Sequence, residues 1–177
     1  MRNITVEEYS PEWPELYRKE AEKVKEIVRG NEVAIYHIGS TSVVGLKAKP
    51  VIDILLVVRE IQLLDQQTAL FERLGYEAMG ELGLPQRRFF RKGGDHRTHH
   101  IHAYQFDNSQ EILRHLCFRD YLVAHPTVAQ EYGQLKQALA LKFPNDIEQY
   151  GDGKDAFVKR IEAEALMDFW QQRAITH

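Results

Sequence analysis

The chain has 177 residues, 44% of them hydrophobic and 28% charged, which is enough for one ordinary globular domain and excludes a disordered or low-complexity protein. A formal net charge of −3 and a pI near 6.2 exclude a general attraction to nucleic acid or anionic membranes, so any anion site must be local. With one cysteine and no apolar run near the roughly 20 residues of a membrane span, we expect a cytoplasmic domain covering residues 1–177, with neither a membrane nor a nucleic acid as partner.

The first half of the chain predicts strands alternating with helices. Residues 4–6 predict a short strand, and apolar residues at helical spacing from Trp13 to Val28 predict an amphipathic helix that ends before Gly30. Residues 33–38 predict a strand that ends in a loop at 39–42. The continuous apolar run over residues 51–58 is typical of a central strand. Residues 61–74 predict another helix, stopped by Gly75.

The second half changes from strands to helices. Residues 87–92 and 99–106 predict two strands joined in a hairpin around residues 93–95. Ser109 is a candidate N-cap, Pro126 opens a second helix, Pro144 ends it, and apolar residues between 157 and 169 mark a third. This order predicts an α+β fold, with a mixed sheet and helices over residues 1–107 and a helical part over residues 108–177.

The most informative segment is the hydroxyl-rich turn at residues 37–42. It is not a phosphate-binding P-loop, because Lys47 does not directly follow Gly45. It is not a nucleophile elbow either, because Ser42 rather than a glycine stands two places after Ser40. What remains is a strand that ends in Gly-Ser, where backbone can approach a ligand closely and hydroxyls can face an anion.

An acid follows in the next predicted strand. Asp53 lies within a run of Val, Ile and Leu, and burying a carboxylate there is costly unless a cation or several donors satisfy it. A functional carboxylate and a structural one, bound to the turn or to Lys49, both account for it. The ligand-binding residues predicted around this turn are His37, Gly39, Ser40, Thr41 and Lys49.

Residues 98–102 place two imidazoles together. Strand alternation puts His100 and His102 on one face, and Asp53 from a neighbouring strand would complete a three-residue set. We consider all three as candidate catalytic residues and candidate ligands of a divalent metal: Mn²⁺ or Zn²⁺, which imidazole suits, or Mg²⁺, which prefers oxygen. Two hydrogen-bonded histidines without a metal explain the pattern equally well.

Four basic residues lie on or beside the first strand of the predicted hairpin. Guanidinium groups bind phosphate or carboxylate in bidentate fashion. Alternation sends Arg87 and Arg91 to one face and Arg88 and Lys92 to the other, so at most one pair serves a site. We predict Arg88 and Lys92 as ligand-binding residues.

At these motifs the chain resembles the GrpB-like family over nearly its whole length. The segments that carry the resemblance are residues 13–14, 37–42, 48–54, 87–90, 98–102 and 118–122. The resemblance implies a nucleotidyltransferase-like fold. It also implies a family whose members occur alone or fused to dephospho-CoA kinase, as a proposed accessory domain.

The wider nucleotidyltransferase superfamily has two acids, one residue apart, on the strand after its Gly-Ser turn, and a third acid on a later strand. The paired acids hold Mg²⁺ ions on a triphosphate. Here residues 39–40 match the turn and Asp53 matches the first acid. Leu55 stands at the second position, and His100 and His102 lie where the third acid is expected.

Three functions therefore remain open. The first is binding of a nucleotide or another small phosphorylated ligand at the turn, with nucleotidyl transfer as the reaction. The second is a non-catalytic accessory module for a partner such as a dephospho-CoA kinase, with Phe118, Tyr121 and Leu122 on the contact surface. The third is a metal-dependent hydrolase that uses Asp53 and the two histidines.

Overall fold

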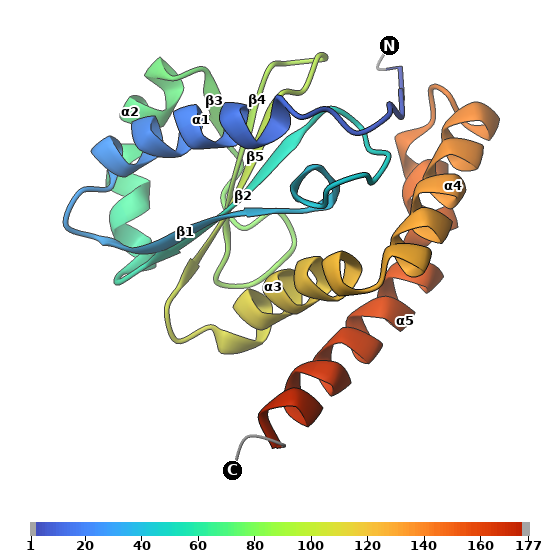
Figure 1. The fold of residues 1–177 in the computed structure, drawn as a ribbon. Helices are drawn as coiled ribbons and strands as arrows, with labels where there is room; N and C mark the ends of the chain where they lie inside the picture. Colours follow the sequence, from blue (N-terminus) through green and yellow to red (C-terminus); the bar gives the residue numbers. More distant parts are fainter. Residues whose placement is uncertain (1–2, 175–177) are drawn as a thin grey trace.

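A mixed sheet with helices on both faces forms the centre of the computed structural model, which describes residues 3–174 (Figure 1). The sheet has five strands in the order β1-β2-β5-β4-β3, with β2 and β5 parallel and the other neighbours antiparallel. The strands are β1 (Glu32–Ile38), β2 (Ile52–Val58), β3 (Tyr76–Ala78), β4 (Arg88–Lys92) and β5 (His99–Gln105). The predicted domain also includes residues 1–2 and 175–177, which lie outside the described residues.

The helices lie before, between and after the strands. They are α1 (Trp13–Ile27), α2 (Thr68–Arg73), α3 (Ser109–Ala124), α4 (Pro126–Lys142) and α5 (Ile147–Ala174), with 3₁₀ turns η1 (Ser40–Ser42) and η2 (Ile61–Gln67). The predicted α+β fold, with a mixed sheet and a helical last third, is therefore confirmed. No helix in residues 3–174 combines the length and the apolar character needed to cross a bilayer.

Strand β2 is buried on both faces, as its apolar run predicted. Ile54, Leu56 and Val58 pack on the side covered by α1 and α2, whereas Leu55 and Val57 pack beneath α3. A strand covered on both faces needs apolar side chains at every position, and this requirement explains the absence of alternation. Asp53, at the start of β2, is the exception.

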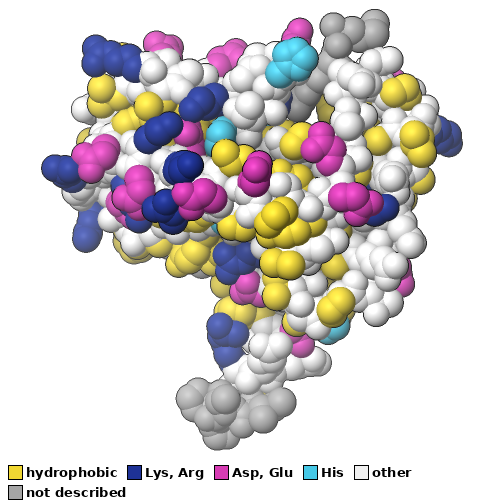
Figure 2. All heavy atoms as spheres, turned by 45° about the horizontal axis from the view of Figure 1, so that its top comes forward, with side chains coloured by type: hydrophobic (Ala, Val, Ile, Leu, Met, Phe, Trp, Pro, Cys, Tyr) yellow, Lys and Arg dark blue, Asp and Glu magenta, His cyan; other side chains and the backbone are white. Residues whose placement is uncertain are grey.

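Helix α1 is amphipathic because its apolar residues recur at helical spacing. Trp13, Ala21 and Val24 face the sheet, while the outer face carries ion pairs one turn apart. Figure 2 shows acidic and basic side chains interspersed on one face of the molecule rather than gathered by sign. Such exposed pairs add little stability, but their mixture fits the small net charge.

Two sequence predictions were wrong in detail, and one strand was missed. Residues 4–6 form no strand; the segment is held instead by an isolated bridge between Glu7 and Ala48. Residues 61–74 divide into η2 and α2, because the buried Ile61 and Leu64 are three apart, which suits the three residues per turn of a 3₁₀ helix. Strand β3 was not predicted, since three residues are too few to show periodicity.

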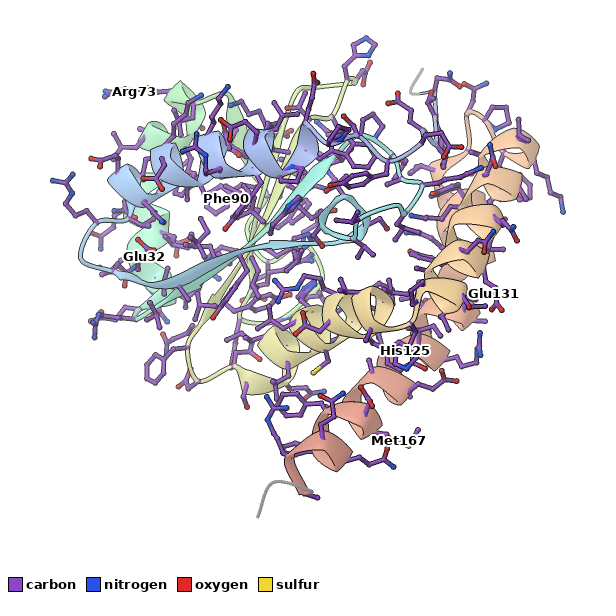
Figure 3. The ribbon with its side chains drawn as sticks, in the orientation of Figure 1. Glu32, Arg73, Phe90, His125, Glu131 and Met167 are labelled. Carbon is purple, nitrogen blue, oxygen red and sulfur yellow. The ribbon has the colours of Figure 1, made fainter. Side chains whose placement is uncertain are left out.

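In the helical third, α3 covers the face of the sheet opposite α1 and α2, and α3, α4 and α5 together pack against the segment that follows the β1 turn. Figure 3 places His125 at the junction of α3 and α4, and Met167 on the later half of α5. Leu122 is buried, and Phe118 and Tyr121 pack into the apolar cluster between these helices. Leu122 is therefore unavailable to a partner, whereas Phe118 and Tyr121 are only partly buried, so the partner surface predicted on these three residues stays a prediction.

Candidate functional site

The turn after β1 brings backbone directly against a carboxylate. Ile38, the last residue of β1, pairs with Asp53, so the turn begins beside that acid. Gly39 has a φ of +71°, and a Cβ at this position would lie 2.7 Å from Asp53 Oδ2. The Ser42 amide and hydroxyl both donate to the Gly39 carbonyl and close the turn. Both the backbone conformation and the close approach therefore require glycine.

Gly39→Ala is expected to lower the free energy of unfolding by about 2–4 kcal/mol, through left-handed strain plus the clash with Asp53. Gly45→Ala is the matched control, because Gly45 has a φ of +83° but a Cβ added there would meet nothing within 4 Å. The control should lose only about 1–2 kcal/mol, from backbone strain alone. Urea unfolding of both variants checks the difference, and equal losses would contradict a tight contact at Asp53.

Asp53 and the two predicted histidines meet on one face of the sheet. Asp53 Oδ1 lies 3.2 Å from His102 Nε2 and 3.4 Å from His100 Nδ1. Burial raises the pKa of Asp53, but the contacts with the two imidazoles outweigh that effect and hold the pKa below its usual range. The acid is therefore ionised at neutral pH, and the His102 imidazole donates to it through Nε2.

A third histidine, from α3, adjoins this group. The His115 ring centre lies 5.0 Å from that of His102, and burial is the main cause that lowers the pKa of His115 to about 2. Burial also lowers the pKa of His102. Since His102 Nε2 donates to a carboxylate, its Nδ1 carries the lone pair, and within residues 3–174 that buried atom has no hydrogen-bond partner. Both of these histidines are neutral at pH 7.

The predicted metal set gains no support from this geometry. Among the residues that the structure describes, no group of three or more His, Cys, Asp or Glu side chains could hold a metal ion. At the position of the superfamily's second acid, Leu55 is fully buried with Ile38, Val57 and Tyr104. The donor set therefore does not fit the two-metal arrangement that the resemblance implies.

Two lysines that sequence reasoning did not single out complete the site. Lys136, from α4, is 3% exposed, and its Nζ donates to Ser40 Oγ at 2.7 Å. Lys154, from α5, is half-buried and lines the same cavity. In the described part of the chain neither lysine forms an ion pair with a carboxylate. Burial lowers the pKa of Lys136 to about 6, with Lys154 and Lys49 adding to the effect and Asp53 opposing it.

The sequence did contain a signal for both lysines. Lys136 stands four residues after Tyr132 and four before Ala140, on the stripe that α4 buries. Lys154 stands four residues after Tyr150 and seven before Ile161, on the buried stripe of α5. A lysine inside an apolar helical stripe indicates a charge directed into the protein.

These residues line two cavities that meet at Asp53. The first, of about 110 Å³, is lined by Ser40, Thr41, Ala48, Lys49, Val51, Asp53, Tyr132, Lys136, Tyr150 and Lys154. The second, of about 210 Å³, is lined by Ile38, Gly39, Asp53, His102, Arg114, His115, Phe118, Tyr132, Lys154, Val158 and Glu162. One side is thus rich in lysine and hydroxyl groups, and the other in imidazole.

The side chain of His37, a predicted ligand residue, lies outside both cavities. His37 stacks on Tyr17, with 4.8 Å between the ring centres, and its Nε2 is 2.9 Å from Thr41 Oγ1. Burial is the main cause that lowers the pKa of His37 to about 4. This residue holds Thr41 in place from behind the turn.

The two predicted cations on β4 are turned away from the pocket. Arg88 forms a bidentate ion pair with Asp65, at 2.7 and 3.0 Å. Lys92 pairs with the buried Glu20 at 2.7 Å. Residues paired across strands share a face. Arg88 pairs with Ala103 and Lys92 with His99, and these two residues alternate with His100 and His102 along β5. Both cations therefore lie on the face of the sheet opposite His100 and His102. These ion pairs join β4 to η2 and to α1.

The fold and site together define an α+β protein with a lysine- and histidine-lined pocket at the turn end of a mixed sheet. A family model described as GrpB protein matches residues 3–164, and the chain belongs to that family. A crystal structure of conserved protein GrpB from Enterococcus faecalis superposes with a TM-score of 0.91 and 53% identity, over 94% of this chain and 99% of that one. A structure of the Cid1 poly(U) polymerase matches at a TM-score of 0.46 and 12% identity, over 75% of this chain and 45% of that one.

Relatives in two bacteria are longer than this chain. UPF0157 protein YqkA of Bacillus subtilis is 44% identical, over 93% of this chain and 48% of its own length. UPF0157 protein PA4798 of Pseudomonas aeruginosa is 41% identical, over 88% of this chain and 65% of its own length. The chain therefore spans about half to two thirds of the length of these relatives.

Proposed function

We propose that this protein binds a small phosphorylated ligand, with a nucleotide the member of that class that the family resemblance favours. The observation that carries the proposal is Lys136, an almost fully buried lysine that contacts Ser40 and has no acidic partner in the described chain. Burying an amine without a counter-charge is unfavourable. A phosphate group in the first cavity would supply the missing negative charge.

The surrounding groups fit a phosphate in this position. Lys49 and Lys154 line the same cavity and Ser40 adds a hydroxyl, whereas the Thr41 hydroxyl already donates to the Val51 carbonyl. Lysine is a common phosphate ligand, and the electrostatic gain is larger where water is excluded. Asp53, at the meeting point of the cavities, would repel a second anionic group. We therefore expect the uncharged part of the ligand to occupy the histidine side.

This observation favours phosphate binding over the two alternatives. A metal-dependent hydrolase would need a ligand set around Asp53, and an accessory module would need an exposed contact surface; neither requires a buried lysine beside Ser40. Nucleotidyl transfer and partnership with a dephospho-CoA kinase stay predictions from the resemblance.

Sulfate, an ionised stand-in for phosphate, is expected to bind at the first cavity with an affinity that falls as pH rises from 6 to 8. Lys136 has a pKa of about 6 in the free protein, and an anion raises that pKa by favouring the ammonium form. Binding above pH 6 therefore takes up a proton, and the dissociation constant should rise by up to about tenfold per pH unit, then level off below pH 6. Titration followed by ¹H–¹⁵N NMR measures the constant and locates the site.

Lys154→Met should weaken sulfate binding about tenfold, because one charged contact is lost. Lys47→Met is the matched control: it also removes one lysine, but Lys47 pairs with Glu8 at 3.0 Å, outside the cavity. The control should leave binding unchanged at constant ionic strength. Shifts spread over the surface, or equal weakening in both variants, would refute a phosphate site here.

A further inference from the structure

The contact between Ser40 and Lys136 has the geometry of a nucleophile beside a base. The two side chains come from distant parts of the chain, and Ser40 Oγ lies 2.7 Å from Lys136 Nζ. Ser40 is partly exposed and lines the first cavity, whereas Lys136 is 3% exposed behind it. A ligand in the cavity thus meets the hydroxyl, while the amine stays shielded from bulk water.

The groups around the amine favour its neutral form. Burial and the positive neighbours Lys154 and Lys49, which line the same cavity, oppose the ammonium form and outweigh the cation–π contact with the Tyr132 ring, whose centre lies 4.4 Å from Nζ. Among the described residues that line this cavity Asp53 is the one acid, and its Oδ1 faces the two histidines of β5. A neutral amine has a lone pair, so the 2.7 Å contact allows the serine proton to pass to nitrogen.

We propose that Ser40 is a nucleophile and Lys136 its general base, acting on a phosphoric anhydride or ester. This inference rests on the proposed function, because the electrophile is the phosphate group bound in the same cavity. It requires the fraction of the complex in which Lys136 is neutral, and since the bound anion favours the ammonium form, that fraction grows as pH rises. It goes beyond binding, since the serine becomes a covalent carrier of the phosphoryl or nucleotidyl group. It also needs no second acid, so the buried Leu55 presents no obstacle.

The step balances without any further reactant. The Oγ–P bond forms as the P–O bond to the leaving group breaks. The hydroxyl proton passes to Lys136 Nζ, and the resulting ammonium gives it to the leaving oxygen. Lys49 and Lys154 would offset the negative charge that accumulates on the phosphoryl oxygens. The product is a serine phosphoester, which water or an acceptor hydroxyl then cleaves.

An alkyl fluorophosphonate tests the dyad directly, because its attack by serine forms Oγ–P and releases fluoride. Intact-mass spectrometry should show one adduct per chain, and peptide mapping should place it on Ser40. The labelling rate should rise with pH and reach a plateau above about pH 6, where the amine is neutral. Lys136→Met and Lys136→Gln should both label at least about 100-fold more slowly.

Ser10→Ala is the control, because it also removes one serine hydroxyl, but that hydroxyl accepts from the Glu12 amide and lies outside the cavity. It should label at the wild-type rate, and an NMR spectrum of each variant confirms its fold. No adduct, an adduct on another residue, or equal labelling of the Lys136 variants would overturn the dyad.

Sulfate titration of the same samples separates the two proposals. Wild-type protein that binds sulfate but resists labelling would overturn the dyad and leave phosphate binding intact. Labelling of Ser40 without sulfate binding would overturn the proposed function, and with it the assignment of a phosphate substrate.

Discussion

Lys136→Met is expected to weaken sulfate binding by about 100-fold while raising the melting temperature by about 2–4 °C. The loss of affinity follows because the variant removes the buried charge that faces the ligand. The gain in stability follows because Lys136 is 3% exposed, and an apolar side chain of similar length avoids the cost of burying an amine. Opposite effects on binding and stability are expected of a residue kept for function.

The stability gain should also depend on pH. Unfolded lysine titrates near 10.5, whereas burial lowers the pKa of Lys136 in the folded protein to about 6. Between these values the unfolded state holds one more proton, so the penalty that the lysine imposes grows as pH falls and is complete below about 6. The gain from Lys136→Met should therefore be larger at pH 6 than at pH 9. Thermal unfolding at both pH values measures it.

The control for both effects of Lys136→Met, on sulfate binding and on stability, is Lys47→Met. This variant replaces a lysine that pairs with Glu8 outside the cavity. That variant should lower stability by less than about 1 kcal/mol, through loss of the contacts with Glu8 and Gln137, and leave sulfate affinity unchanged. If Lys136→Met instead destabilised the protein and retained sulfate binding, Lys136 would be a structural residue, and the proposed function would lose its main support.

Leu55→Asp is expected to lower the free energy of unfolding by about 3–5 kcal/mol. The substitution supplies the second acid of the nucleotidyltransferase superfamily, but Leu55 is fully buried against Ile38, Val57 and Tyr104. A carboxylate in that cluster loses its hydration and the leucine's apolar contacts. Urea unfolding measures the loss, with Leu55→Met as a volume-conserving control that should lose less than about 1.5 kcal/mol.

This variant also tests the metal prediction. Without the second acid, the described chain has no metal-holding group around Asp53. A Leu55→Asp protein as stable as the wild type, with newly acquired Mn²⁺ binding in a calorimetric titration, would show that the fold can accommodate a two-acid centre. The expected result is instability without metal binding.

Local patterns were sufficient for most of the fold. The apolar run of β2, the helical spacing of α1 and the prolines that open or end helices each act within one element, so sequence alone shows them. Prediction failed where tertiary contact overrides propensity. Residues 61–67 form a 3₁₀ helix to seat Ile61 and Leu64, and β3 exists only because β4 pairs with it.

For the candidate site too, some features could be predicted from the sequence and others could not. The meeting of Asp53 with His100 and His102 was predictable, because alternation places each side chain on a face and parallel pairing brings β2 beside β5. Alternation puts Arg88 and Lys92 together on one face of β4, but only the register of β4 on β5 shows that His100 and His102 lie on the other face, and neither pattern says which face carries the site. That depends on where the helical third packs.

The amino-acid sequence by itself determined the elements, the family resemblance, the glycine turn and the acid that faces two imidazoles, because these depend on local spacing and on neighbouring strands. Only the tertiary structure decided that Lys136 and Lys154 enter the pocket, that Arg88 and Lys92 do not, and that Leu55 leaves no room for a second acid. The physical reason is that the burial of a charge depends on the elements packed around it, and here α4 and α5 close over a turn formed about a hundred residues earlier in the chain.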